Sequence, residues 1–289
     1  MAEKKSKLVI ILGPTAVGKT DYAIEKALEY GSPIISCDSR QIYKEMRIGT
    51  AVPSAAQLSA VQHYFIGNKS VLDPYTAGQY ERDAIELIEN LFAEGHETLV
   101  MTGGTMFYID AVCNGLDNLP QASPELRARL MERLRNEGTT YMAEELRVLD
   151  PETYYSIDVQ NGQRVIRALE VCLETGRPFS SYKTHKVAVR DFEIEKIGLN
   201  RPREVLFDRI NRRVLQMMDE GLEQEARSLI QYRDLPALQT VGYKELFSYF
   251  DGVNTLEEAV MSIQSHTRNY AKKQLTWWKR DKSIKWIDL

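Results

Sequence analysis

The distribution of hydrophobic and polar positions predicts buried strands separated by helices. Leu8–Leu12 is apolar at every position, as parallel strands covered on both faces are. Asp21–Tyr30 carries apolar residues at the spacing of one helix face, and Gly31 suits the residue that ends a helix. The same reasoning predicts further strands at Pro33–Cys37, Thr98–Met101, Glu193–Leu199 and Ile284–Ile287.

Capping residues predict where two longer helices begin. Thr76 and Gln79 have the spacing of a capping box, in which each residue satisfies a free backbone N–H near the helix start. Thr255 and Glu258 repeat this spacing before a helix that we expect to reach about Trp278. Strands and helices therefore alternate, which is the order of a parallel α/β sheet.

The pattern changes to short helices without strands between about residues 121 and 190. Ser123-Pro124 and Asp150-Pro151 each place a capping side chain before a proline suited to the first helical position. Gly176 follows a predicted helix that includes Gln163–Glu174. We therefore expect an α/β fold with a parallel-sheet core from residues 1–120 and 191–289, and a small all-helical domain inserted at residues 121–190.

Composition and charge exclude several classes of protein. The chain has 289 residues, of which 43% are hydrophobic and 27% charged, so it is neither disordered, nor collagen-like, nor a disulfide scaffold. Its net charge of −4 excludes a strongly basic, histone-like binder. A local basic patch stays compatible with that total, because net charge averages over the whole surface.

The cysteines and the apolar segments indicate a protein of the reducing cytoplasm. The chain has three cysteines, Cys37, Cys113 and Cys172, without CxxC spacing. An odd number in this pattern argues against a disulfide framework or a structural zinc site. Leu8–Leu12 is too short to span a bilayer and precedes no small-residue cleavage site. We expect no membrane anchor and no export signal.

One motif predicts a diphosphate site. The sequence GPTAVGKT at Gly13, Pro14, Thr15, Ala16, Val17, Gly18, Lys19 and Thr20 matches GxxxxGK[ST] between a predicted strand and a predicted helix. Its backbone N–H groups and Lys19 would hold an anion, and the Thr20 hydroxyl could bind Mg²⁺. This indicates a P-loop NTPase-like core. Most such loops bind a nucleotide such as ATP, so the loop alone does not fix the reaction.

Further candidate residues follow the predicted strands or lie on a later helix. Asp38 follows the second strand and could accept a proton, hold Mg²⁺ through water, or only cap the next segment. Gly103-Gly104 permits close backbone approach, and Thr105 could bind a substrate or only form a turn. Arg209 and Arg213 share a helix face that could hold a leaving diphosphate or lie in solvent.

In several blocks the sequence resembles the tRNA dimethylallyltransferases, also called tRNA isopentenyltransferases. These blocks keep the family order over nearly the whole chain. They are Gly13–Thr20, Asp38–Tyr43, Ile48–Ala51, Gly103–Tyr108, Gln163–Glu170, Val241–Tyr243 and Tyr270–Trp277. The P-loop is common to many enzymes. The blocks at Asp38–Tyr43, Gln163–Glu170 (the Arg164 block), Val241–Tyr243 and Tyr270–Trp277 are much more specific to this family.

The resemblance implies a prenyl transfer. Dimethylallyl diphosphate would donate its dimethylallyl group to N6 of the adenosine just 3′ of the anticodon in certain tRNAs, releasing diphosphate with Mg²⁺ required. Asp38 would be the general base and Thr105 would position the reacting groups. Lys19, Arg209 and Arg213 would stabilise the charge on the leaving diphosphate. The family resemblance also suggests a monomer, and no obligate protein partner is evident.

The resemblance also implies a tRNA-binding surface. The target base must leave the anticodon loop to reach the pocket. Residues 264–289 carry seven basic and two acidic side chains among Tyr270, Trp277 and Trp278, of which at least one tryptophan should pack in the core. The predicted tRNA contacts are Asp38, Ser39, Arg40, Gln41, Thr105, Arg127, Gln163, Arg164, Arg167, Gly242, Tyr243, Lys272, Lys273 and Gln274. The insert, residues 121–190, is thereby assigned to the anticodon arm.

The sequence departs from the family at two places, and other functions stay open. Tyr64 stands where relatives often have a second histidine beside His63, and Met106-Phe107 replaces a small or aliphatic pair. The alternatives are a small-molecule kinase with the insert as lid, an enzyme that prenylates free AMP, and an RNA-binding module with a structural loop. The Arg164 block and the basic C-terminal helix favour tRNA as the acceptor.

Overall fold

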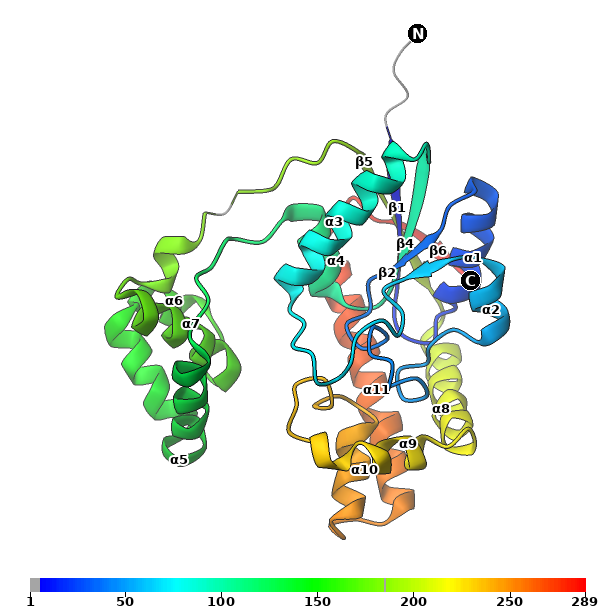
Figure 1. Cartoon of the computed structure of the whole chain (residues 1–289). Helices are drawn as coiled ribbons and strands as arrows, with labels where there is room; N and C mark the ends of the chain where they lie inside the picture. Colours follow the sequence, from blue (N-terminus) through cyan, green and yellow to red (C-terminus); the bar gives the residue numbers. More distant parts are fainter. Residues whose placement is uncertain (1–5, 185) are drawn as a thin grey trace. The chain divides into compact units, whose positions relative to one another are not determined.

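A parallel β-sheet forms the core of one part of the computed structural model, which describes residues 6–184 and 186–289 (Figure 1). Its six strands within those residues follow the order β3-β2-β4-β1-β5-β6. Every neighbouring pair is parallel, and Leu8 of β1 lies beside Leu99 of β4 and Ile194 of β5. The strands are β1 (Lys7–Leu12), β2 (Ile34–Ser36), β3 (His63–Tyr64), β4 (Thr98–Thr102), β5 (Glu193–Asn200) and β6 (Lys285–Asp288).

Helices connect successive strands, and several more lie between β5 and β6 in the sequence. In the first half of the chain they are α1 (Lys19–Tyr30), α2 (Ala55–Ala60), α3 (Ala77–Ala93) and α4 (Met106–Asn114). After β5 they are α8 (Arg203–Asp219), α9 (Leu222–Ser228), the short η2 (Ile230–Tyr232), α10 (Tyr243–Phe250) and α11 (Leu256–Trp278). The predicted capping boxes are present at Thr76 and Thr255, and Gly31 ends α1 in the left-handed conformation.

Alternate residues of β1 face opposite sides of the sheet. Leu8, Ile10 and Leu12 pack with residues of α3, α4 and α11, whereas Val9 and Ile11 pack with residues of α1 and α8. All five side chains are buried. This double coverage is the reason the strand is apolar at every position, and it confirms the predicted parallel α/β core.

The chain divides into two compact units. The core unit comprises Met1–Cys113 with Val189–Leu289, and the insertion unit comprises Asn114–Ala188, drawn mainly in green in Figure 1. The insertion unit is helical in its described residues, as predicted, and it begins before residue 121. Its elements are α5 (Pro124–Leu149), α6 (Pro151–Ser156), α7 (Gly162–Thr175) and η1 (Phe179–Tyr182).

The insertion unit has its own hydrophobic core and its own polar joints. Side chains of α5 and α7 form that core, and α5 is kinked where Gly138 has φ of 81°. Ser123 caps α5 as predicted, and Asp150 caps α6. The buried Asp150 carboxylate also accepts hydrogen bonds from the backbone and hydroxyl of Ser180, so it fixes η1 to the start of α6.

Among the described residues, no helix has the length and apolar character needed to cross a membrane. Cys37, Cys113 and Cys172 are buried free thiols. Burial raises the pKa of the Cys113 thiol to about 11, and burial together with nearby Asp38 raises that of Cys37 further. These thiols are therefore protonated at neutral pH and serve as core residues.

Candidate active site

The carboxyl ends of neighbouring strands bring the candidate residues together. The P-loop follows β1, Asp38 follows β2, and Thr105 follows β4, which lies between those two strands in the sheet. Because all three strands are parallel, these loops leave the sheet at the same edge. The predicted grouping of the P-loop, the Asp38 loop and the Gly103-Gly104-Thr105 loop therefore follows from the strand order.

The P-loop backbone turns sharply, with positive φ at Gly13, Ala16 and Gly18. Gly13 has φ of 150°, and a Cβ there would lie 2.7 Å from the Leu199 carbonyl oxygen at the end of β5. Ala16 and Gly18 have φ of 64° and 112°, values that direct the chain into the first turn of α1. The turn leaves the N-terminal N–H groups of α1 at the loop, where an anion would be stabilised.

Lys19 is held within this loop. Its ammonium donates hydrogen bonds to the carbonyl oxygens of Gly13 at 2.9 Å and Pro14 at 3.0 Å. Burial, and after it the nearby Arg213 guanidinium, lowers the pKa of Lys19 to about 8, while the Asp38 carboxylate acts in the opposite direction. Lys19 is thus cationic at neutral pH but close enough to titration to respond to a bound anion.

Arginines from the segment after β5 surround the P-loop. The predicted Arg209 is exposed and donates from Nε to the Ala16 carbonyl oxygen at 2.8 Å. Arg213 is half-buried, and desolvation lowers its pKa. Arg201, which the sequence analysis missed, donates from Nε to the Val17 carbonyl oxygen at 2.7 Å. Arg209 and Arg213 therefore lie on the P-loop side of α8. Arg212 instead faces solvent, where it pairs with Asp208.

Asp38 has both a structural and an available oxygen. Its Oδ1 accepts hydrogen bonds from the backbone N–H groups of Arg40 at 2.9 Å and Gln41 at 3.3 Å. Its Oδ2 has no hydrogen-bond partner in the part of the chain that the structure describes. The capping role and a role in chemistry are therefore compatible, because they use different oxygens of one carboxylate.

The Gly103-Gly104-Thr105 loop packs directly on the Asp38 loop. The Thr105 hydroxyl oxygen accepts a hydrogen bond from the Ser39 N–H at 2.9 Å and lies 3.2 Å from the Ser39 hydroxyl. A Cβ on Gly103 would lie 2.7 Å from the Cys37 backbone carbon. Only glycine permits this approach, so Gly103 serves the close contact that its sequence suggested.

Gln274 of α11 joins the same loops from inside the protein. Its side chain is 1% exposed. Its Oε1 accepts from the Thr15 N–H at 2.9 Å, and its Nε2 donates to the Gly104 carbonyl oxygen at 2.8 Å, to which the Tyr270 hydroxyl also donates at 3.1 Å. Its amide therefore fixes the spacing of two site loops from a buried position.

Glu225 of α9 is a second connecting residue that the sequence analysis missed. It accepts hydrogen bonds from the backbone N–H groups of Arg47, Ile48 and Gly49 and from the Tyr243 hydroxyl, all within 2.9 Å. Tyr243 is 0% exposed, and a Cβ on Gly49 would lie 2.7 Å from its ring. The Ile48–Ala51 and Val241–Tyr243 blocks are therefore one packed unit.

Gln41 connects that packed unit with the Asp38 loop. Its Nε2 donates to the carbonyl oxygens of Thr50 at 3.1 Å and Ala51 at 3.0 Å, while its backbone N–H reaches Asp38. Arg40 is half-buried, and its guanidinium donates to the Ser39 carbonyl oxygen at 3.3 Å. Gly242 precedes α10 with φ of 101°. The Gln41 side chain thus holds the backbone at Thr50 and Ala51, and Gly242 provides the positive φ before α10.

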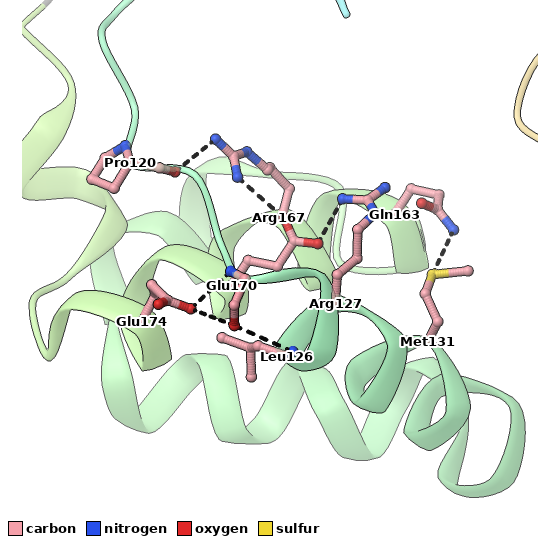
Figure 2. A network of polar contacts seen from close by, with 9 residues as sticks. Pro120, Leu126, Arg127, Met131, Gln163, Arg167, Glu170 and Glu174 are labelled. Atoms are coloured by element: carbon pink, nitrogen blue, oxygen red, sulfur yellow. Dashed lines mark hydrogen bonds and ion pairs between the residues drawn. The ribbon is translucent and has the colours of Figure 1, made fainter. Parts of the chain in front are cut away.

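In the insertion unit, the predicted polar side chains lie on α5 and α7, and Figure 2 shows three of them, Arg127, Gln163 and Arg167. Arg127 and Arg167 both reach the carboxylate of Glu170, with N–O distances of 2.6 Å and 3.1 Å. Gln163 lies on the exposed surface, with its amide near the Met131 sulfur at 3.6 Å. Arg164 is exposed, and its side chain makes no polar contact with the described residues.

The C-terminal helix α11 presents basic side chains and two partly exposed aromatic side chains, Tyr270 and Trp277. Lys272 and Lys273 are exposed on α11. Trp277 is partly exposed and donates from Nε1 to Asp110 at 2.9 Å, while Trp278 is buried. The expectation that one tryptophan packs in the core is confirmed by Trp278.

A divalent metal would have few protein ligands here. The residues that the structure describes contain no group of three or more His, Cys, Asp or Glu side chains placed to hold a metal ion. The Thr20 hydroxyl, partly exposed at the start of α1, has no hydrogen-bond partner among those residues. A hydroxyl free at this position fits a Mg²⁺ ion held mainly by diphosphate oxygens and water, because Mg²⁺ often keeps most of its water.

Comparisons with known proteins agree on one family. A family model described as IPP transferase matches residues 41–281. The tRNA dimethylallyltransferase 2 of Porphyromonas gingivalis is 50% identical over 99% of this chain and 95% of its own length. The tRNA dimethylallyltransferase 1 of Bacteroides thetaiotaomicron is 48% identical over 97% of this chain and 91% of its own length.

Solved structures show the same fold. The full-length tRNA isopentenylpyrophosphate transferase from Bacillus halodurans matches 98% of this chain and 90% of its own, with a TM-score of 0.71 and 36% identity. A eukaryotic dimethylallyltransferase acting on tRNA matches 98% of this chain and 74% of its own, with a TM-score of 0.79. At 23% identity, the second match supports the fold alone.

Proposed function

The chain belongs to the IPP transferase family, and from that premise we propose that it is a tRNA dimethylallyltransferase. It transfers the dimethylallyl group of dimethylallyl diphosphate to N6 of the adenosine just 3′ of the anticodon and releases diphosphate. The observation that supports this most is that a P-loop and a carboxylate with one available oxygen lie at the same edge of the sheet, in a chain half identical to curated tRNA dimethylallyltransferases over nearly its full length.

The P-loop is the donor site in this proposal. The N–H groups at the start of α1 and the Lys19 ammonium bind the diphosphate, while Arg209 and Arg213 approach from α8. Arg201 joins them, since its guanidinium is already fixed against the loop. As the bond between the allylic carbon and oxygen breaks, negative charge grows on the diphosphate, and these cations stabilise it. No phosphoryl group moves, so the loop serves carbon–oxygen cleavage.

Asp38 acts on the acceptor. The N6 nitrogen forms the new bond to the allylic carbon, the diphosphate leaves with the electron pair of the broken bond, and Asp38 Oδ2 takes one N6 proton. Oδ1 meanwhile keeps its hydrogen bonds to the backbone, so the carboxylate is oriented before the reaction. Thr105 and Ser39 fix the neighbouring loop, and we assign them to positioning.

Mg²⁺ is the proposed cofactor, with Thr20 as its protein ligand. When bound, the ion would supply positive charge to the leaving diphosphate. This chain's own part is to present a free hydroxyl beside the anion site at the start of α1.

We assign tRNA binding to the insertion unit and to the exposed lysine side chains of α11. Arg127, Gln163, Arg164 and Arg167 form the proposed surface in the insertion unit, and Lys272 with Lys273 forms the one on α11. The buried Tyr243 and Gln274 are assigned to positioning, because neither side chain reaches the surface.

The function is tested by offering labelled dimethylallyl diphosphate together with unmodified tRNA, AMP or ATP. We expect label in tRNA alone, with release of diphosphate. As a matched control, a tRNA with guanosine in place of the target adenosine should stay unlabelled, because it lacks the N6 amine. Label in AMP would instead indicate an adenylate prenyltransferase, and phosphate transfer from ATP would indicate a kinase.

Arg164→Glu is expected to weaken tRNA binding without affecting the donor. The exchange removes a cation from the proposed surface and adds repulsion, so tRNA affinity should fall. The dependence of log affinity on log salt should become shallower by about one unit for each phosphate that the protein no longer neutralises. Titration of tRNA at several salt concentrations measures both effects, beside binding of inorganic diphosphate.

The matched control for this prediction is Arg147→Glu. Arg147 is an exposed arginine at the C-terminal end of α5 that pairs with Glu144. Its exchange alters the net charge of the insertion unit by the same amount. If both variants weaken binding equally, or if Arg164→Glu binds tRNA like the unaltered protein, Arg164 lies outside the tRNA interface.

A further inference from the structure

A single buried carboxylate holds two arginines of the insertion unit (Figure 2). Glu170 is 1% exposed, whereas Arg127 and Arg167 keep 50% and 35% of their side chains exposed. The Arg127 guanidinium contacts Glu170 Oε1 at 2.6 Å, and that of Arg167 contacts Oε2 at 3.1 Å. Arg167 also donates to the Pro120 carbonyl oxygen at 3.1 Å. Each guanidinium is therefore anchored at one side and open to solvent at the other.

We propose that Glu170 is a positioning residue for tRNA recognition, because it fixes Arg127 of α5 and Arg167 of α7 as a preformed pair of phosphate-binding cations. This inference rests on the proposed function and adds a residue that would not itself touch the tRNA. Both carboxylate oxygens are paired with arginines of the unit, so the Glu170 charge repels an incoming phosphate less than an unpaired carboxylate would.

Preorganisation is the physical gain from this arrangement. A free arginine side chain has many rotamers, and ordering it on binding reduces affinity. Here the protein orders two arginines during folding. The planar guanidinium can hold one carboxylate oxygen with some of its N–H groups while other N–H groups stay available for a phosphate.

The charge of Glu170 allows a test with opposite signs. Glu170→Gln removes one negative charge, so a general electrostatic effect on a polyanion predicts equal or tighter tRNA binding. Loss of a positioning residue predicts weaker binding despite the added positive charge. A residue that only joined α5 to α7 would affect thermal stability and leave tRNA affinity at or above its original value.

The experiment compares tRNA binding by four forms of the full chain: unaltered, Glu170→Gln, Glu144→Gln and Arg167→Ala. Glu144 is half-exposed in the same unit and pairs with Arg147, so its exchange matches the charge change without touching the arginine pair. We expect Glu170→Gln to weaken tRNA binding about tenfold, the order expected when two long side chains must be ordered on binding. Glu144→Gln should bind tRNA at least as tightly as the unaltered protein.

Kinetics separate positioning from loss of fold. In Glu170→Gln, the KM for tRNA should rise while kcat at saturating tRNA and the KM for dimethylallyl diphosphate stay unchanged. Circular dichroism and a thermal melt establish that the variant is folded at the assay temperature. If it is not, Glu170→Asp is measured instead; it keeps the charge but withdraws the carboxylate, and it should still weaken tRNA binding several-fold.

The outcomes distinguish this inference from the proposed function. If Arg167→Ala weakens tRNA binding and folded Glu170→Gln does not, Glu170 is only a link between helices and the inference is overturned, while the tRNA surface stands. If Arg167→Ala and Arg164→Glu both bind tRNA normally, the proposed surface fails and the inference fails with it. Weakening by Glu170→Gln and Arg167→Ala, but not by Glu144→Gln, supports the assignment.

Discussion

Asp38→Asn should lower the rate of prenyl transfer by about 10² to 10⁴, the range that a general base contributes. The exchange is nearly isosteric, and the amide carbonyl oxygen of the new side chain can still accept from the N–H groups of Arg40 and Gln41, as Oδ1 does now. What the amide lacks is an oxygen that can take the N6 proton. The loop should therefore keep its shape while the chemical step slows.

Single-turnover kinetics with saturating tRNA and donor measure this effect directly. Binding of both substrates and the melting temperature should stay close to those of the unaltered protein. Asp73→Asn is the matched control, because Asp73 also accepts a backbone N–H, from Ser70 at 3.2 Å, but lies outside the three site loops. A near-normal single-turnover rate in Asp38→Asn would assign Asp38 to capping alone.

Lys19→Met should reduce kcat/KM for dimethylallyl diphosphate by about 10² to 10³, the order seen when one group that stabilises developing negative charge is removed. Methionine keeps most of the apolar stem but loses the ammonium that lies within hydrogen-bond distance of Gly13 and Pro14. Affinity for tRNA should change little, since Lys19 is proposed to face diphosphate. Loss of tRNA binding with donor binding retained would contradict this division between the two sites.

The same lysine predicts a pH dependence of donor binding. Its pKa in the folded protein is about 8, lowered mainly by burial. A bound diphosphate favours the ammonium form and raises that pKa, so binding near pH 8 should take up protons, and affinity should fall as pH rises through this range. Calorimetry with inorganic diphosphate in buffers of different ionisation enthalpy measures the uptake.

The control for Lys19 lies on the same helix. Lys26 is paired with Glu29 at 2.6 Å, and Lys26→Met removes an equal charge away from the P-loop. Its pH profile for diphosphate should match that of the unaltered protein, whereas the profile of Lys19→Met should lose the component near pH 8. Diphosphate also ionises in this pH range, but its contribution is the same for both variants and cancels when their pH profiles are subtracted. Identical profiles for both would show that Lys19 does not titrate with the ligand.

Local sequence determined the elements and the catalytic loops. The apolar run of β1 predicted a doubly covered strand because hydrophobic burial on both faces leaves no polar position. Capping residues predicted the starts of α3, α5, α6 and α11 because a cap satisfies N–H groups within a few residues. The P-loop was evident for the same reason, since its anion site is built from consecutive N–H groups.

Tertiary structure alone decided which distant residues complete these loops. Gln274 joins Thr15 to Gly104, Glu225 holds the backbone near Gly49, and Glu170 joins α7 to α5. Residue spacing did not predict these contacts, because the residues that they join lie tens or hundreds of positions apart in the chain. The sequence also does not distinguish a glutamine or glutamate that will be buried from one that will be exposed. Burial decided their roles: a polar side chain inside the protein must find partners, and only the packed chain determines which donors and acceptors come within reach.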